Sequence, residues 1–303
     1  MLVDRYGRPV DRLRISVTQR CNLKCFYCHK EGIRETGGPE LSPEELSKIV
    51  EVAASLDIRK VKLTGGEPLV REDIVEIVFL LSQHGLQDLG VTTNGILLSQ
   101  LASSLADAGL MRVNVNLPSL KPSNYRRIAG VDRLHDVLSG VNAARDAGLT
   151  PIKLNYVVLK GLNDNEFFSM LNYARKVDAI LQVIELEPMG SGRSVYGDYH
   201  ADLKPYEEWL HQHSSKITTR SFHLRKQYLV DGVWVELVKP IHNPLFCLHC
   251  TRLRLTSSGK LKTCLMSNDP EIDLKPLLDK SEWRELLREA FLKAVALRKP
   301  FYQ

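Results

Sequence analysis

The chain has 303 residues, which is too long for one small domain and matches a barrel-sized domain with an appendage. Its hydrophobic content of 44% and charged content of 25% are ordinary for a folded, soluble protein. The 41 basic and 36 acidic residues leave a net charge of +5, which suits an anionic small substrate. A dedicated DNA-binding protein concentrates far more basic charge, so we expect no nucleic acid partner.

The first twelve residues are charged and have no apolar core, which excludes a secretory signal. The most apolar stretch, residues 74–81, is short and contains Glu76, so it predicts a buried helix face and not a membrane span. We therefore expect a cytoplasmic protein without membrane contact. In that reducing compartment, six cysteines in two tight groups indicate metal ligands and not disulfides.

From residue 13 to residue 188, an apolar β-branched run alternates with a helical pattern six times. The predicted strands are 14–18, 61–64, 89–93, 112–117, 152–159 and 181–186. The predicted helices are 43–56, 72–84, 99–108, 132–147, 164–177 and 203–214. Ser42 and Pro43 form a helix start, while Gly109 and Gly148 lie where two helices are expected to end.

Strict alternation with near-continuous apolar strands predicts an α/β fold with a parallel sheet covered by helices. Six units are too few for a closed eightfold barrel, so we predict a partial, open (β/α)6 TIM-like barrel. Its chemistry is expected at the C-terminal ends of the strands. The alternation stops near residue 216, and a β-like run over 228–238, a second cysteine group and a final helix follow. The sequence thus predicts a barrel domain over 1–216 and a C-terminal cluster-binding extension over 217–303.

The first cysteine group, Cys21-x3-Cys25-x2-Cys28, directly follows the first predicted strand. Three thiolates at this spacing can hold one [4Fe–4S] cluster and leave one iron without a protein ligand. An open metal position is typical of catalysis, whereas an electron-transfer ferredoxin would supply a fourth cysteine nearby. The next cysteine is Cys247, more than two hundred residues away.

The second group, Cys247-x2-Cys250-x13-Cys264, also has three cysteines and predicts a second open cluster. Arg252 and Arg254 follow on alternate positions, so in an extended segment they would point the same way and could bind phosphate. A zinc ribbon built from the two C-x2-C pairs is the alternative, and it would leave one cysteine of each group unused.

Two further motifs lie at strand ends: the Gly65-Gly66-Glu67-Pro68 turn after the second strand and residues 92–95, Thr-Thr-Asn-Gly, at the end of the third. Together with the first cysteine loop and its aromatic Tyr27, they resemble the radical S-adenosylmethionine (SAM) superfamily. The resemblance implies that the open iron binds SAM, whose cleavage yields a 5′-deoxyadenosyl radical.

Within that superfamily, residues 4–266 resemble the GTP 3′,8-cyclase family of molybdenum or tungsten cofactor biosynthesis. The resemblance rests on residues 4–9 (Asp-Arg-Tyr-Gly-Arg-Pro), on 13–18, on the 160–164 turn, and on the second cysteine group with its Arg-x-Arg. It implies conversion of GTP to 3′,8-cyclo-7,8-dihydro-GTP with SAM and two [4Fe–4S] clusters, the second of which binds guanine.

By motif, the resemblance also assigns contact residues. The implied GTP contacts are Arg14, Lys62, Thr92, Lys153, Arg252 and Arg254. The implied SAM contacts are Tyr27, Gly66, Asn116 and Glu187. The implied partners are GTP, an electron donor such as ferredoxin or flavodoxin, the downstream cyclic pyranopterin monophosphate synthase and a second copy of the chain.

The sequence departs from the family at several places. Lys62 stands where bacterial members have arginine, Glu187 replaces a methionine and Gln182 replaces an arginine. The strand-four motif reads Asn-Val-Asn-Leu-Pro over 114–118, and the chain ends Lys-Pro-Phe-Tyr-Gln in place of a Gly-Gly tail. A radical SAM enzyme acting on a peptide or a tetrapyrrole therefore remains the alternative enzyme. A zinc-stapled RNA-binding module is the alternative from another class of protein.

Overall fold

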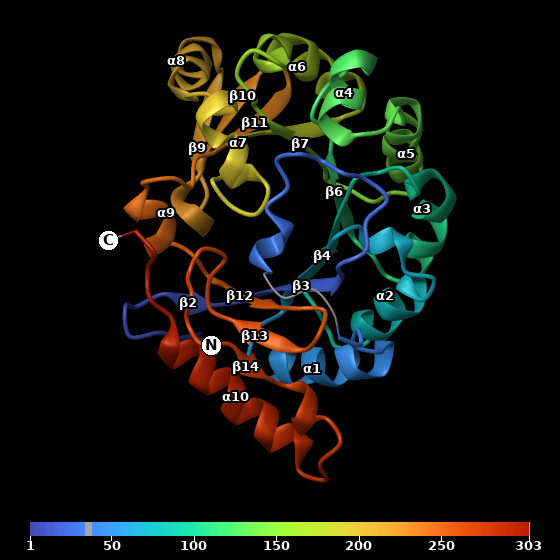
Figure 1. Ribbon diagram of the computed structural model, residues 1–303, viewed down its shortest axis with the longest axis vertical. Helices are drawn as coiled ribbons and strands as arrows, with labels where there is room; N and C mark the ends of the chain where they lie inside the picture. The colour runs from blue at the N-terminus through green and yellow to red at the C-terminus, as the bar shows by residue number, and fades with distance from the viewer. Residues whose placement is uncertain (34–37, 303) are drawn as a thin grey trace.

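The computed structural model describes residues 1–33 and 38–302. A curved sheet lies at its centre, with helices on the outer face (Figure 1). The six central parallel strands are β3 (Arg12–Thr18), β4 (Lys60–Gly65), β5 (Asp88–Thr93), β6 (Arg112–Asn116), β7 (Ile152–Val157) and β8 (Ala179–Ile184). The helices that follow them are α1 (Pro43–Ser55), α2 (Ile74–Ser82), α3 (Leu98–Asp107), α4 (Pro122–Ala129), α5 (Leu134–Asp146), α6 (Phe167–Lys176), α7 (Gly192–Tyr199) and α8 (Lys204–His213).

The predicted helix ends have clear local causes. The Ser42 hydroxyl oxygen accepts from the backbone N–H of Glu45, and the Glu45 carboxylate accepts from the backbone N–H of Ser42. These two hydrogen bonds form a capping box at the start of α1. Gly109 and Gly148 follow α3 and α5 with φ values of 101° and 75°, which glycine adopts without steric cost. Helices α4 and α7 were not predicted from the sequence, although Pro122 and a left-handed Gly130 bracket α4.

The segment after residue 216 adds strands to both edges of the same sheet. It contains β9 (Lys216–Thr219), β10 (Lys226–Val230), β11 (Val233–Val238), α9 (Pro244–Leu248), β12 (Arg252–Leu255), β13 (Lys260–Lys262), β14 (Ile272–Asp273) and α10 (Trp283–Leu297). Strand β11 lies parallel to β8, and β12 lies parallel to β3. The order across the sheet is therefore β14-β13-β12-β3-β4-β5-β6-β7-β8-β11-β10-β9, which confirms an open barrel. The division at residue 216 remains a prediction, since strands from both sides of it share one sheet.

The central strands alternate between apolar side chains that face the helices and polar side chains that face the interior. On β3, Leu13 and Ile15 are buried in the hydrophobic core, whereas Arg12 and Arg14 line an internal cavity. Strand β4 repeats this pattern, with Lys60 and Lys62 facing inward. The expectation of near-continuous apolar strands was therefore wrong at the inward positions, because this barrel encloses a polar space and not a packed core.

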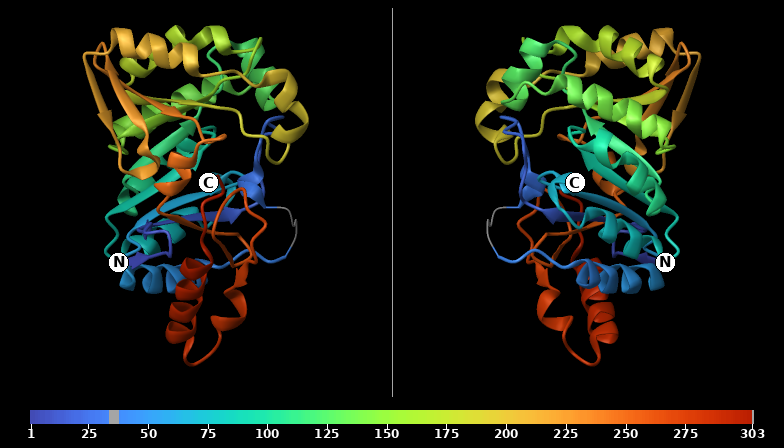
Figure 2. Two further views of the ribbon diagram at one scale, coloured as in Figure 1. Left: turned by 90° about the vertical axis from the view of Figure 1, so that its left-hand side faces the viewer. Right: turned by 90° about the vertical axis from the view of Figure 1, so that its right-hand side faces the viewer.

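A short ribbon at the N-terminus, β1 (Leu2–Val3) and β2 (Pro9–Val10), lies near α10 and the C-terminal strands, below the barrel in Figure 2. Helix α2 carries the apolar stretch 74–81, and Ile74, Ile77, Val78 and Leu81 are buried, as the sequence predicted. No helix in the described part of the chain has the length and apolarity needed to span a bilayer.

Candidate active site

A single cavity of about 600 Å³ inside the barrel brings the two cysteine groups together. Every site residue named from the sequence lines it. These are Cys21, Cys25, Cys28, Cys247, Cys250 and Cys264, the four positions Tyr27, Gly66, Asn116 and Glu187, and the six positions Arg14, Lys62, Thr92, Lys153, Arg252 and Arg254. Residues that are more than two hundred positions apart in the sequence thus share one internal space.

The first cysteine group lies on the loop after β3, which neighbouring segments hold through the main chain. The N–H of Lys24 donates to the carbonyl of Ala129 at 3.0 Å, and the N–H of Ser191 donates to the carbonyl of Cys28 at 2.9 Å. Burial raises the pKa of Cys25 to about 12, and the neighbouring thiols Cys28 and Cys21 add to this effect. Three thiols that hinder one another's ionisation are suited to a cationic iron cluster, which would favour their thiolate forms.

The second cysteine group lies around α9 and after β13. Burial raises the pKa of the Cys247 thiol, and Cys264 and Cys250 also contribute. Among residues 1–33 and 38–302, no three His, Cys, Asp or Glu side chains are grouped as ligands of one metal ion. An iron–sulfur cluster distributes its ligands over several iron atoms, so it needs thiols that are near one another without meeting at one point. Both triads fit this description.

Two buried arginines hold the loop between Cys247 and Cys250. Arg8 donates to the carbonyl of Cys247 at 3.0 Å, and Arg298 donates to the carbonyl of Cys250 at 2.5 Å. Both guanidiniums pair with the carboxylate of Asp4, at 2.8 Å and 3.1 Å, and all three side chains are at most 5% exposed. We call Asp4, Arg8 and Arg298 the terminal clamp. The 4–9 motif noted in the sequence supplies two of its three members.

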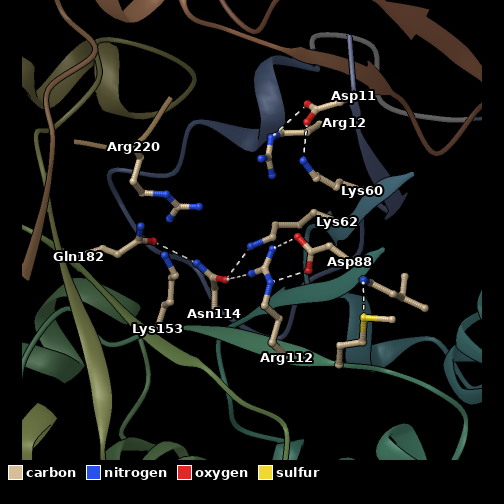
Figure 3. Close-up of polar contacts among 12 residues, drawn as sticks. Asp11, Arg12, Lys60, Lys62, Asp88, Arg112, Asn114, Lys153, Gln182 and Arg220 are labelled. Carbon is tan, nitrogen blue, oxygen red and sulfur yellow. Dashed lines mark hydrogen bonds and ion pairs between the residues drawn. The ribbon is translucent and has the colours of Figure 1, made fainter. Parts of the chain in front are cut away.

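Six cations from the strands and the β9–β10 connection point into the same part of the cavity (Figure 3). We call them the basic floor: Arg12, Lys60, Lys62, Arg112, Lys153 and Arg220. Lys60 pairs with Asp11 at 2.6 Å, and Arg112 holds Asp88 with two bonds of 2.6 Å each. Four of these cations were not predicted from the sequence: Arg12, Lys60, Arg112 and Arg220. The i, i+2 spacing of cations on the first two strands was the available signal for Arg12 and Lys60.

Glu236 lies beside this floor and is completely buried. Its carboxylate accepts from Lys153 and Arg220 at 2.7 Å each, and Arg225 lies 3.4 Å away. Burial alone would raise the pKa of Glu236, but Lys153, Arg225 and Arg220 hold it well below its usual value. Burial also lowers the pKa of Lys153 to about 8, although Glu236 opposes the shift. One carboxylate thus neutralises only part of the surrounding positive charge.

Glu31 has the equivalent role on the other side of the cavity. It accepts from Arg14 at 2.8 and 2.5 Å, from Arg254 at 2.8 Å and from the Thr64 hydroxyl at 2.9 Å. Arg252 and Lys62 differ, because no described carboxylate forms an ion pair with either. Burial and the neighbouring cations hold both of their pKa values well below the usual range. This excess of buried positive charge favours a polyanionic ligand.

The ring of Phe222 packs against three of these guanidiniums. The guanidinium carbons of Arg12, Arg252 and Arg225 lie 4.6, 4.9 and 5.2 Å from its centroid. Cation–π contacts orient the arginines without using their N–H donors. Arg12 also pairs with Asp11 and Arg225 with Glu236, so it is the remaining N–H donors that are available for phosphate oxygens.

The four positions matched to SAM contacts lie toward the C-terminal ends of the strands. A Cβ on Gly66 would come within 2.1 Å of the carbonyl oxygen of Arg20, so only glycine fits there. Asn116 accepts from the side chain of Asn155 at 2.9 Å and keeps its own amide N–H groups for other partners. The Oε2 atom of Glu187 is buried without a hydrogen-bond partner among the described residues. A bound ligand with a donor group would satisfy it.

The open parallel barrel, the three-cysteine loop after β3 and the glycine turn after β4 define a radical SAM enzyme, a class that uses SAM and a [4Fe–4S] cluster. Residues 15–174 match the family model "Radical SAM superfamily", and residues 179–303 match "Molybdenum Cofactor Synthesis C". A probable GTP 3′,8-cyclase of Thermococcus kodakarensis is 48% identical over 309 residues, which cover 100% of both chains. One from Methanothermobacter thermautotrophicus is 44% identical over 99% of this chain and 98% of its own. The chain belongs to the GTP 3′,8-cyclase family.

Two solved structures support the fold. SuiB of Streptococcus suis bound to S-adenosylmethionine has a TM-score of 0.65 at 15% identity, covering 92% of this chain and 68% of that chain. The anSMEcpe structure with bound AdoMet has a TM-score of 0.56 at 17% identity, covering 92% of this chain and 83% of that chain. At these identities the likeness concerns the fold alone.

Proposed function

We propose that this enzyme cyclises GTP to 3′,8-cyclo-7,8-dihydro-GTP in the biosynthesis of the molybdenum or tungsten cofactor. The observation that carries the proposal is the single cavity in which two cysteine triads lie with an excess of buried cations. The reaction joins C3′ of the ribose to C8 of guanine. The 5′-deoxyadenosyl radical takes a hydrogen atom from C3′ and becomes 5′-deoxyadenosine. After the C3′–C8 bond forms, the base gains one electron from the external donor and one proton, so the product is an isomer of GTP.

In this proposal Cys21, Cys25 and Cys28 hold the first [4Fe–4S] cluster. Bound there with SAM, that cluster supplies the 5′-deoxyadenosyl radical that removes the 3′ hydrogen. Tyr27, Gly66, Asn116 and Glu187 surround the SAM. The buried Glu187 oxygen, which has no hydrogen-bond partner among the described residues, supports this assignment.

Cys247, Cys250 and Cys264 would hold a second [4Fe–4S] cluster in the same cavity. Its open iron would bind and orient the guanine base. The terminal clamp keeps the Cys247–Cys250 loop in position for this role. Two triads, each able to leave one iron open, match a reaction that must hold SAM and the base at separate sites.

The triphosphate would bind to the cations of the cavity. Arg14, Lys62, Lys153, Arg252 and Arg254 were assigned from the sequence, with Thr92 as a neutral contact. To these we add Arg12, Lys60, Arg112 and Arg220 of the basic floor. Charge-assisted bonds to phosphate would also relieve the mutual repulsion of these buried cations.

An anaerobic assay of the reconstituted enzyme with SAM, dithionite and each nucleoside triphosphate tests the activity. We expect 5′-deoxyadenosine and a product isobaric with GTP, read by mass spectrometry, from GTP alone. A reaction in which 5′-deoxyadenosine forms while every nucleotide stays unchanged would favour the alternative substrates, a peptide or a tetrapyrrole.

Two cysteine variants separate the roles of the triads. Cys264→Ala should retain SAM cleavage and about half of the bound iron, and it should lose the cyclised product. Cys28→Ala should lose SAM cleavage itself. A Cys264→Ala enzyme that still cyclises GTP would refute the role given to the second triad. The physiological electron donor, a following cyclic pyranopterin monophosphate synthase and a homodimer complete the proposal as its expected partners.

A further inference from the structure

Seven exposed cations border the first cysteine loop on its solvent side. We call them the basic rim: Arg20, Lys24, Lys30, Arg126, Arg127, Lys160 and Arg193. They are distinct from the basic floor, because the floor residues line the internal cavity and the rim residues do not. The rim carries a larger positive charge than the net +5 of the whole chain.

Backbone hydrogen bonds bring the segments of the rim together. Besides the bond from Lys24 to Ala129, the N–H of Phe26 donates to the carbonyl of Ile128 at 3.3 Å, so the C-terminal end of α4 lies against the loop. The bond from Ser191 to Cys28 brings the start of α7 to the same place, and Figure 2 shows the loop and α7 on one side of the molecule. Arg127 donates to the hydroxyl of Tyr199 at 3.1 Å, which joins α4 to α7.

Ion pairs compensate little of the charge of the rim. Arg20 forms a 3.3 Å pair with Glu40, and none of the other six rim cations forms an ion pair with a described carboxylate. Helix α4 contains no acidic residue at all. The nearby Glu31 is buried and turned toward the cavity cations. The acids near the rim that reach solvent are Glu40, Asp73, Asp132, Asp164 and Asp198.

Cys21 is the most exposed of the three loop cysteines, and the rim cations Arg20, Lys24 and Lys30 lie on the same loop. We infer that the basic rim docks an acidic protein that carries one electron, and that the electron passes from that carrier to the first cluster. This inference rests on the proposed function, which requires an external electron for each SAM cleaved. In the transfer the carrier loses one electron and the cluster gains it. Complementary charge would raise the association rate and orient the carrier toward the loop.

The test compares two double charge reversals on similar helix ends. Arg126→Glu with Arg127→Glu changes the rim, and Arg175→Glu with Lys176→Glu changes two exposed cations in the last turn of α6 as the matched control. The initial rate of 5′-deoxyadenosine formation is measured anaerobically with limiting reduced flavodoxin, an acidic flavoprotein, and separately with dithionite. We expect the rim variant to lose roughly tenfold or more of the flavodoxin-driven rate at low ionic strength. Its dithionite-driven rate should match that of the unmodified enzyme.

Salt provides a second criterion. The flavodoxin-driven rate of the unmodified enzyme should fall as ionic strength rises, and that of the rim variant should depend on salt much less. Equal flavodoxin-driven rates in the two double variants would overturn the inference. A rim variant that also loses its dithionite-driven rate would overturn it too, because the rim would then act on the cluster loop itself.

Failure of the proposed function gives a different result. If the unmodified enzyme makes no 5′-deoxyadenosine with dithionite, the radical chemistry fails, and a calorimetric titration of flavodoxin into each variant at low salt still decides the docking surface. Weaker flavodoxin binding by the rim variant than by the α6 variant supports the docking surface. Equal binding rejects it.

Discussion

Glu236 organises the basic floor through one buried carboxylate. Lys153, Arg220 and Arg225 all surround it, and Gln182 and Gln227 donate to it as well. Removing its charge would leave three closely spaced cations, of which Lys153 is buried, repelling one another while keeping nearly the same side-chain shape. The cost of breaking a buried pair in this way is several kcal/mol, which is a large part of the stability of a typical domain.

We therefore predict that Glu236→Gln lowers the free energy of unfolding by about 3 kcal/mol or more. Urea denaturation of the cluster-free protein, followed by circular dichroism, measures the change. Glu289→Gln on the exposed face of α10 is the control, and it should shift the free energy by less than about 0.5 kcal/mol. A change in Glu236→Gln as small as that of the control would mean that the three cations are neutralised by other means.

Lys153 gives the site a dependence on pH. Burial lowers its pKa to about 8 from the ordinary 10.5, so in the free enzyme it loses its charge as the pH rises through 8. A bound triphosphate would raise that pKa, and binding would then be coupled to uptake of a proton. GTP affinity should fall as the pH rises above about 8, by up to about tenfold per pH unit for one coupled proton.

Calorimetric titration of GTP between pH 7 and pH 9 measures this slope. Lys153→Arg keeps its charge across that range, so its GTP affinity should stay nearly constant where that of the unmodified enzyme falls. An equal slope in both proteins would assign the coupled proton to another group, with Lys62 as the next candidate because its pKa is also strongly lowered.

At the scale of elements, the two ends of the chain meet at the second cysteine group. The N-terminal ribbon contributes Asp4 and Arg8, and the residue after α10 contributes Arg298. Neither end supplies a cysteine, but the two arginines fix the carbonyls of Cys247 and Cys250. The cluster loop therefore depends on segments that precede and follow the barrel.

Arg298→Met should loosen this loop and reduce the iron retained by the second triad, leaving about half of the iron of the unmodified enzyme after gel filtration. Iron and sulfide analysis, together with the electron paramagnetic resonance signal of each reduced cluster, would show which one is lost. Arg288→Met, on the exposed face of α10, is the matched control and should retain both signals. If Arg298→Met keeps all its iron and both signals, the clamp has no role in holding the cluster.

At the scale of the whole molecule, local sequence patterns predicted the helices and strands. The pairing of strands that are distant in the sequence determined which further side chains meet in the cavity. The alternation of strands and helices, the two C-x2-C groups and Arg252-x-Arg254 were sufficient to predict an open barrel and the residues that line its cavity. Glu236 could not be found in this way, because it lies within a mostly apolar run, 233–238. Only the pairing of β11 with β8 places it opposite Gln182 and next to Lys153.

The same reasoning explains why Glu31, Arg112 and Arg220 were missed. None of the three belongs to a motif, and their importance comes from partners on other elements: Arg14 for Glu31, Asp88 for Arg112 and Glu236 for Arg220. The expectation of uniformly apolar strands failed for a related reason. Composition alone does not reveal that every second side chain faces a cavity filled with charge.

The pairing of β12 with β3 has a consequence for how the enzyme is made. Arg12 and its partner Arg252 are joined only after most of the chain has been synthesised, a delay of roughly 12 to 48 s at ordinary translation speeds. During that interval the first three cysteines have emerged from the ribosome while one edge of the sheet is still missing. Iron delivered to the nascent chain would therefore reach the first cysteine triad long before the second triad has been synthesised. The cavity that contains the radical would form only when the C-terminal segment has added its strands to the sheet.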